Sequence, residues 1–161
     1  MNFCRHKKCQ NPEGGIQVEK REIREGLLHA ERARKQLIRP KLQELGLTPG
    51  QGQVGILNRL LQRPNLSQRE LADLCHLDVT TMSRSLDRLE EEGLLRREKN
   101  PDCRRSYQVC LTPAGEKKAR EVQAVLRQMD EIICEGISEQ EHEEFLRILR
   151  KICGNMERSI E

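Results

Sequence analysis

Hydroxyl and guanidinium side chains gather on one side of residues 78–92 if this segment is a helix. At about 100° per residue, the apolar positions that such a helix would bury place Arg84 almost directly opposite, and Thr80 and Arg88 share its sector. Threonine and arginine donate hydrogen bonds to base edges and phosphates in the major groove of DNA. The segment therefore predicts a recognition helix, with candidate DNA contacts at Thr80, Thr81, Ser83, Arg84 and Arg88.

The competing interpretation of this helix is an ordinary solvated face. Arginine and threonine are common on such faces, and the carboxylates of Asp87, Glu90, Glu91 and Glu92 would repel phosphate. Most of these acids fall late in the segment, away from the end expected to enter the groove. Taken alone, the helix leaves both interpretations open.

A second basic group follows in Asp102-Cys103-Arg104-Arg105. Strands predicted at 94–99 and 106–112 would flank residues 100–102 as a hairpin, with Arg104 and Arg105 close to its tip. Arginine suits a narrow, electronegative minor groove, and Asp102 could orient Arg104 through a charged hydrogen bond. The alternative is an exposed turn with solvated charges. Because the hairpin follows a candidate recognition helix, we expect a DNA-binding wing.

The chain has seven cysteines, an odd number without the spacing of a disulfide framework, which favours a reducing compartment and mainly free thiols. Cys103, expected at the wing tip, is a candidate redox residue; the alternative is an inert surface thiol. Cys4, His6 and Cys9 are close enough to share a soft metal, but they lack a partner pair at zinc-module spacing. We therefore expect a disordered leader and claim no metal site.

The sequence offers no constellation for catalysis. The four histidines are dispersed, and we expect Gly50-Gln51-Gly52 within an early helix turn rather than after a strand, where a phosphate-binding loop would stand. We expect neither an enzyme nor a cofactor.

The composition favours duplex DNA over other polyanions. A net charge of +3 is too small to attract a polyanion by itself, so local clusters must form any nucleic-acid site. With no Trp, one Tyr and two Phe, the chain has few rings on which splayed single-stranded bases could stack. No stretch approaches the roughly 20 apolar residues of a membrane span, and the N-terminus lacks an apolar signal region. We expect a cytoplasmic protein with no membrane partner.

Helical periodicity and capping residues predict a mainly α fold with a small β-hairpin wing. Helices are expected at 19–45 with a kink or break at Pro40, from a Thr48-Pro49 cap to about 62, at 67–76 from a Ser67/Glu70 capping box, at 78–92, at 113–136 and from Ser138 onward. Met82, Leu86 and Leu89 form the expected inward stripe of the recognition helix.

Four parts follow from this order of elements. They are a flexible N-terminal extension (1–18), a dimerisation helix (19–46), a winged helix-turn-helix DNA-binding lobe (47–112) and C-terminal dimerisation helices (113–161). The helix expected at 19–45 has more apolar stripe than a monomer of this size needs, and we expect the stripes of residues 20–45, 114–134 and 139–157 to form a dimer core. We therefore expect a homodimer with an obligate interface of roughly 2,000 Å² or more.

The chain resembles the MarR family of winged-helix regulators. The similarity runs in register over residues 20–158, through Leu47-Thr48-Pro49, residues 66–72, 83–90 and 93–97, the Asp-x-Arg wing at Asp102 and Arg104, and residues 111–115. The resemblance implies a dimer that binds palindromic operators and represses until a small molecule, an oxidant or a metal releases it. It places Arg84 in the major groove and Arg104 in the minor groove; the cysteine in the wing and the Cys-rich leader depart from the family pattern.

The sequence thus predicts a sequence-specific, double-stranded-DNA-binding transcriptional regulator, a repressor released by a small-molecule effector or an oxidant. Two alternatives stay open: a winged-helix protein-interaction module without specific DNA binding, since a fold does not fix a function, and a metal-responsive regulator. The effector, the operator and the regulated genes are not written in the sequence.

Overall fold

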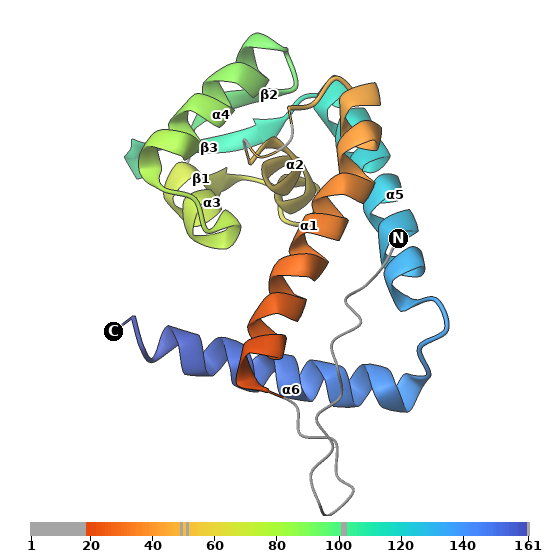
Figure 1. Cartoon of the computed structure of the whole chain (residues 1–161). Coiled ribbons are helices and arrows are strands. Elements are labelled where there is room, and N and C mark those ends of the chain that lie inside the picture. The colour runs from red at the N-terminus through yellow and green to blue at the C-terminus, as the bar shows by residue number, and fades with distance from the viewer. Residues whose placement is uncertain (1–18, 49, 51, 101–102, 161) are drawn as a thin grey trace, which may run out of the picture. The chain divides into compact units, whose positions relative to one another are not determined.

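The computed structural model describes residues 19–48, 50, 52–100 and 103–160, with the backbone only for residues 100 and 103–106. Over these residues the chain is mainly helical with a small sheet (Figure 1), as predicted. The elements are α1 (Lys20–Glu44), α2 (Gln53–Gln62), β1 (Leu66–Ser67), α3 (Gln68–Cys75), α4 (Val79–Glu91), β2 (Leu95–Asn100), β3 (Cys103–Leu111), α5 (Pro113–Cys134) and α6 (Glu139–Glu157).

The first helix runs through Pro40 and ends at Glu44, so the predicted alternative of a break at this proline is wrong. The boundary between two compact units falls within the helix, between Leu37 and Ile38. Beyond it, Ile38 and Leu42 are buried in the core of the second unit.

Helix α2 begins later than predicted. The Thr48-Pro49 cap was expected to start it, but its first residue is Gln53 and its N-cap is Gly52, whose φ of 75° is left-handed and suits glycine. Gly50 and Gly52 therefore precede the helix instead of lying in its first turn; Pro49 and Gln51 lie outside the described residues. The buried Gln53 amide supplies a local contact, because its Oε1 accepts a hydrogen bond from the Thr48 N–H at 2.9 Å.

The helix pair α3 and α4 has the predicted caps. Ser67 Oγ accepts from the Glu70 N–H at 3.2 Å while Glu70 Oε2 accepts from the Ser67 N–H at 2.8 Å, a complete capping box. Helix α3 ends at Cys75 with His76 as its C-cap, α4 begins after Asp78, and Gly93 follows α4 with a φ of 70°. Two short, well-capped helices therefore stand on either side of a tight turn.

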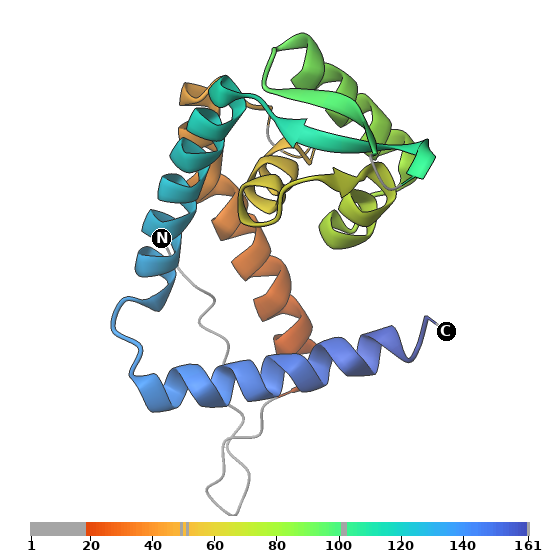
Figure 2. The ribbon, with the colours of Figure 1, turned by 180° about the vertical axis from the view of Figure 1, so that it is seen from behind.

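The three strands form one antiparallel sheet in the order β1-β3-β2. Strand β1, a two-residue element that periodicity did not reveal, pairs Leu66 with Val109. Strands β2 and β3 pair in register from Leu95 with Leu111 to Lys99 with Tyr107, and the register then shifts so that Asn100 pairs with Cys103. Figures 1 and 2 show this hairpin extending beside α4, as a wing does.

The core of the second unit lies between α2, α3, α4, the sheet and the first half of α5. The side chains that are fully or almost fully enclosed there include Ile56, Leu57, Leu60, Leu66, Leu71, Met82, Leu86, Leu89, Leu95, Val109, Ala119 and Val122. Gly115 lets α5 pack closely on this core, because a Cβ atom there would lie 1.7 Å from the Leu94 carbonyl oxygen. The inward stripe predicted for the recognition helix is confirmed.

The C-terminal helices α5 and α6 have apolar side chains that are exposed to solvent. Helix α5 begins at Pro113, as predicted, and Thr112 caps it by accepting a hydrogen bond from the Gly115 N–H at 3.0 Å. No residue of α6 is buried, although the helix has an apolar stripe. Large exposed apolar side chains near the end of α5 and on α6 are Ile132, Ile133, Ile137, Phe145, Ile148 and Met156. None of the described helices is long and apolar enough to cross a lipid bilayer.

Candidate nucleic-acid interface

The first turn of α4 is fixed by Asp78. Its Oδ1 accepts from the Thr81 N–H at 2.9 Å, and its Oδ2 accepts from the Thr81 hydroxyl at 2.6 Å. These hydrogen bonds to the charged carboxylate, the one from the Thr81 side chain above all, lower the pKa of Asp78. The cap thereby holds the positively polarised end of the helix in shape.

Helix α4 separates an apolar face from a polar one. Met82, Leu86 and Leu89 are wholly buried, and the neighbouring Ser85 donates from Oγ to the Thr81 carbonyl at 2.7 Å, which satisfies a buried hydroxyl. On the opposite side, Thr80 and Arg84 are exposed. A buried stripe behind and hydrogen-bonding side chains in front are what a helix needs to enter the major groove.

The other predicted recognition-helix residues are less free. Ser83 and Arg88 are half-buried, and Arg88 Nε donates to Glu92 Oε1 at 3.0 Å. The Thr81 hydroxyl hydrogen is already donated to Asp78, so in this state its oxygen can only accept. Of the five predicted contacts on α4, the structure therefore leaves Thr80 and Arg84 most available to an incoming duplex.

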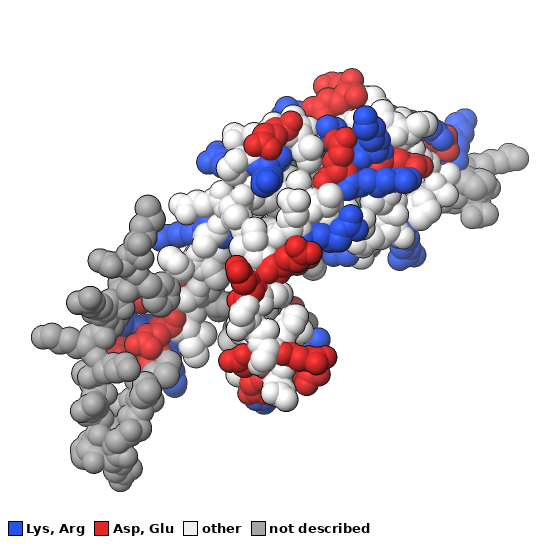
Figure 3. Space-filling view, turned by 90° about the vertical axis from the view of Figure 1, so that its right-hand side faces the viewer, with Lys and Arg blue, Asp and Glu red and all other residues white. Residues whose placement is uncertain are grey.

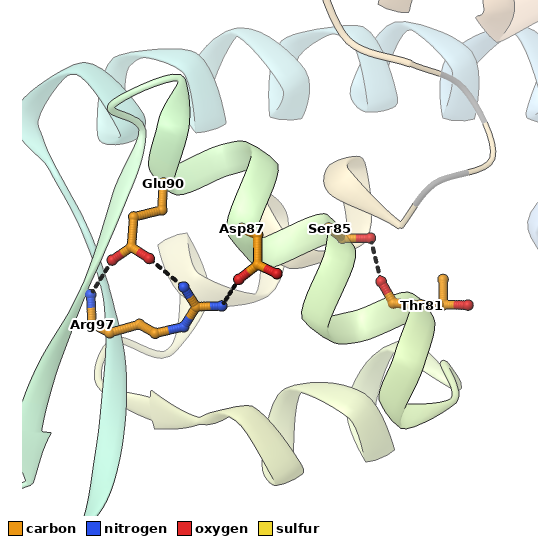
Figure 4. Close-up of polar contacts among 5 residues, drawn as sticks. All are labelled: Thr81, Ser85, Asp87, Glu90 and Arg97. Carbon is orange, nitrogen blue, oxygen red and sulfur yellow. Dashed lines mark hydrogen bonds and ion pairs between the residues drawn. The ribbon is translucent and has the colours of Figure 1, made fainter.

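Arg97, on strand β2 of the wing, joins this strand to α4 (Figure 4). Arg97 Nη2 lies 2.6 Å from Asp87 Oδ1, and Arg97 Nη1 pairs with Glu90 Oε2. The backbone N–H of Arg97 also donates to Glu90 Oε1 at 3.0 Å. Two of the four carboxylates expected to repel phosphate are thus engaged by a wing residue, and Glu92 is engaged by Arg88.

The wing differs from its prediction in one respect. Cys103, Arg104 and Arg105 were expected at the tip beyond the sheet, but they belong to β3, which begins at Cys103 directly opposite Asn100. The reason is the register shift: in a regular ladder Asn100 would pair with Ser106, but it pairs with Cys103, so β3 has three more residues. The side chains of these residues and the whole of Asp102 lie outside the described residues, so their DNA contacts stay predictions.

A cavity of about 340 Å³ opens on the face of strand β2 that points away from α4. Because side chains alternate along a strand, Arg96 and Glu98 line the cavity while Arg97 between them points to α4. The charged groups here are already paired: Arg96 Nε lies 2.5 Å from Glu98 Oε1 and Arg120 Nη2 lies 2.9 Å from Glu116 Oε2.

A buried thiol forms part of the same wall. Cys110 Sγ donates to Asn65 Oδ1 at 3.1 Å, and burial raises the pKa of this thiol, with the neighbouring carboxylate of Glu98 adding to the effect. The thiol is therefore held in its neutral form. No cluster of three His, Cys, Asp or Glu side chains among the described residues could hold a metal ion; Cys4, His6 and Cys9 lie outside them.

Known proteins resemble this chain in sequence and in structure. The family model described as MarR family matches residues 51–107. The solved structure of MarR is 32% identical, covers 83% of this chain and 97% of its own, and superposes with a TM-score of 0.63. The chain belongs to the MarR family. The predicted membership and the winged-helix fold are thereby confirmed.

Two further relatives of the MarR-family chain agree with this assignment. The solved structure of the transcriptional regulator SlyA has a TM-score of 0.75 over 86% of this chain and 96% of its own; at 24% identity this likeness concerns the fold. A protein of Thauera aromatica named as a transcriptional regulatory protein for the hcr operon is 34% identical over 108 residues, or 66% of this chain. The match spans 63% of that relative's length.

Sequence reasoning about this MarR-family chain missed the role of Arg97. A single arginine in a strand carries no periodic signal, and its partners Asp87 and Glu90 stand ten and seven residues earlier. The spacing of Asp87 and Glu90 does put them on one side of the helix, so the signal was present but ambiguous. Net charge could not reveal the arrangement either, because it sums all charges and does not show which of them lie together. Basic and acidic side chains alternate likewise over the upper part of the side shown in Figure 3.

Proposed function

We propose that this MarR-family chain is a transcriptional regulator that binds double-stranded DNA sequence-specifically through α4. The observation that carries the proposal is the exposed pair of Thr80 and Arg84 opposite the wholly buried stripe of Met82, Leu86 and Leu89. Within the described residues, no hydrogen bond or ion pair of Arg84 competes with DNA for its guanidinium. Arginine donates two parallel hydrogen bonds to guanine O6 and N7, which no other base presents in the same pattern.

The wing supports the same proposal. Its hairpin projects beside α4, so one lobe can meet a major groove with the helix and an adjacent minor groove with the wing. We assign the minor-groove contacts to Arg104 and Arg105, with Asp102 orienting Arg104. The family resemblance supports this assignment for Arg104.

The proposed regulator acts as a homodimer. One recognition helix reads too few base pairs for specificity, and two half-sites about one helical turn apart require two such helices. The uncovered apolar stripe of α6 and the end of α5 supports this assembly, because an exposed row of Phe, Ile and Met side chains marks an interaction surface. We further propose that the dimer represses transcription until a small molecule or an oxidant releases it from DNA.

Selection from a pool of random-sequence duplexes tests the proposal. The full chain is expected to enrich a two-fold symmetric sequence whose half-sites lie about 10 base pairs apart. A winged-helix module that binds only other proteins would enrich no sequence, and its weak retention of DNA would vanish as salt is raised. The absence of any enriched sequence would contradict the proposed function.

A further inference from the structure

We propose that Arg97 is a positioning residue of the DNA-binding lobe: it offsets one of the two negative charges of Asp87 and Glu90, so that α4 can approach phosphate with Arg84 free. This inference rests on the proposed function. Arg97 itself faces α4 from strand β2, and its guanidinium forms ion pairs with the two carboxylates. It therefore acts through the charges of the recognition helix.

The position of Asp87 makes its charge important. Asp87 stands three residues after Arg84 and seven after Thr80, so all three side chains fall on the same side of the helix. An aspartate three residues from an arginine is close enough to form an ion pair on the helix surface. In this structure Asp87 Oδ1 instead accepts from Arg97 at 2.6 Å, and Arg84 has no partner among the described residues.

Glu90 is held by the same side chain. One of its oxygens pairs with Arg97 Nη1, and the other accepts from the Arg97 backbone N–H at 3.0 Å. Three contacts thus join β2 to α4 through two adjacent turns of the helix (Figure 4). The Arg97 side chain is 24% exposed, while Asp87 is 54% exposed, so without Arg97 this carboxylate would face solvent, and a bound duplex, with its full charge.

The electrostatic consequence has a definite sign. With Arg97 present, the group of three side chains has one net negative charge; without it, the same surface has two. Phosphate repels each uncompensated carboxylate, and the repulsion falls with added salt because the Debye length is about 10 Å at 0.1 M. A purely mechanical brace between the strand and the helix would show no such salt dependence.

The test compares four forms of the full chain on a duplex selected by the wild type and on a scrambled duplex of the same length. They are wild type, Arg97→Met, Arg97→Lys and the triple variant Arg97→Met/Asp87→Asn/Glu90→Gln. Fluorescence anisotropy measures the dissociation constants from roughly 0.05 to 0.3 M KCl, a range over which screening changes strongly. Thermal melts check folding, and Arg97→Gln replaces Arg97→Met if the latter does not melt cooperatively.

We expect Arg97→Met to weaken binding to both duplexes by about fivefold or more at low salt, the scale of one unit charge a few ångströms from another in a wet interface. The deficit should shrink as salt rises, Arg97→Lys should keep most of the affinity, and the triple variant should recover it. Two results would overturn the inference: Arg97→Met binding like wild type, or the triple variant staying as weak as Arg97→Met at every salt concentration. If the wild type enriches no duplex, the proposed function fails and the inference falls with it.

Discussion

The Thr81 hydroxyl donates a hydrogen bond to Asp78 Oδ2 at 2.6 Å, and the Thr81 N–H donates to Oδ1 of the same carboxylate at 2.9 Å. This pair closes the first turn of α4, the end expected to approach DNA. Because phosphate can only accept hydrogen bonds, Thr81 cannot donate its hydroxyl to phosphate while that hydroxyl donates to the N-cap residue Asp78. Of the two threonines, Thr80 is therefore the better candidate for a phosphate contact.

Replacing Asp78 with alanine should lower the melting temperature by a few degrees, because the first-turn N–H groups lose their acceptor. Asp78→Asn should stay close to wild type, since asparagine caps about as well as aspartate. The pKa of Asp78 is lowered in the folded state, so its stabilising effect is present above the ordinary aspartate pKa of about 3.9 and is lost as the pH falls through the lower folded-state value.

Calorimetry of the Asp78 variants between about pH 7 and pH 2.5, a range that spans the ordinary aspartate pKa, checks this expectation. The difference between wild type and Asp78→Ala should shrink toward the acid end. A difference that stays constant with pH would show that the carboxylate charge has no part in the cap.

Phe145 is 58% exposed on α6, and a negative charge at this position should disrupt the proposed dimer. Phe145→Asp removes apolar area and places an unpaired charge within the expected interface, which costs several kcal/mol if the site is desolvated. Gln140→Asp on the other side of α6 is the matched control, since it changes charge equally on an exposed position. Light scattering should report monomer or unfolded protein for Phe145→Asp and dimer for the control; a stable Phe145→Asp dimer would refute this interface.

Cys110 should be the slowest of the described thiols to react. It is buried and hydrogen-bonded to Asn65, and burial raises its pKa, which lowers the fraction of reactive thiolate. Burial also raises the pKa of Cys75. Alkylation of the native protein followed by mass spectrometry should show Cys110 labelled late, and faster only above the ordinary thiol pKa of about 8.5. Rapid labelling of Cys110 at neutral pH would contradict its burial.

Cys103 is a different case, because it stands at the start of β3 where the wing is expected to meet DNA. If oxidation of this thiol releases DNA, mild peroxide should weaken binding by wild type but not by Cys103→Ser, and a thiol reductant should restore it. Equal loss, or equal retention, in the two proteins would exclude Cys103 as the switch and direct attention to a ligand or another cysteine.

The sequence predicted the fold where local signals were strong. Ser67 with Glu70, Ser138 with Glu141 and Asp78 mark their helices because a side chain must satisfy the free N–H groups of a first turn. The predicted start of α2 was wrong: Thr48-Pro49 has the composition of a cap, but Gly52 is the N-cap and the helix begins at Gln53. Strand β1 is two residues long and exists only through its pairing with β3, so no local pattern could reveal it.

The sequence predicted which face of the recognition helix holds the candidate DNA contacts, but not the ion pairs that join this helix to the wing. Helical periodicity placed Arg84 opposite the buried stripe, as the structure does. The same periodicity could not show that Asp87 and Glu90 are held by Arg97, since this contact depends on how β2 lies against α4. Carboxylates that would repel DNA phosphate are therefore partly neutralised in the folded protein.

The measurement that tests the account most directly is the affinity of wild type and Arg84→Ala for the selected duplex and a scrambled duplex at the same moderate salt. Wild type should prefer the selected duplex, and Arg84→Ala should lose ~1 to 3 kcal/mol of that preference if the guanidinium binds a guanine. Arg127→Ala, which changes an exposed arginine on α5, should leave the preference unchanged. Equal affinity of the wild type for both duplexes, or an undiminished preference in Arg84→Ala, would contradict the claim that α4 reads DNA through Arg84.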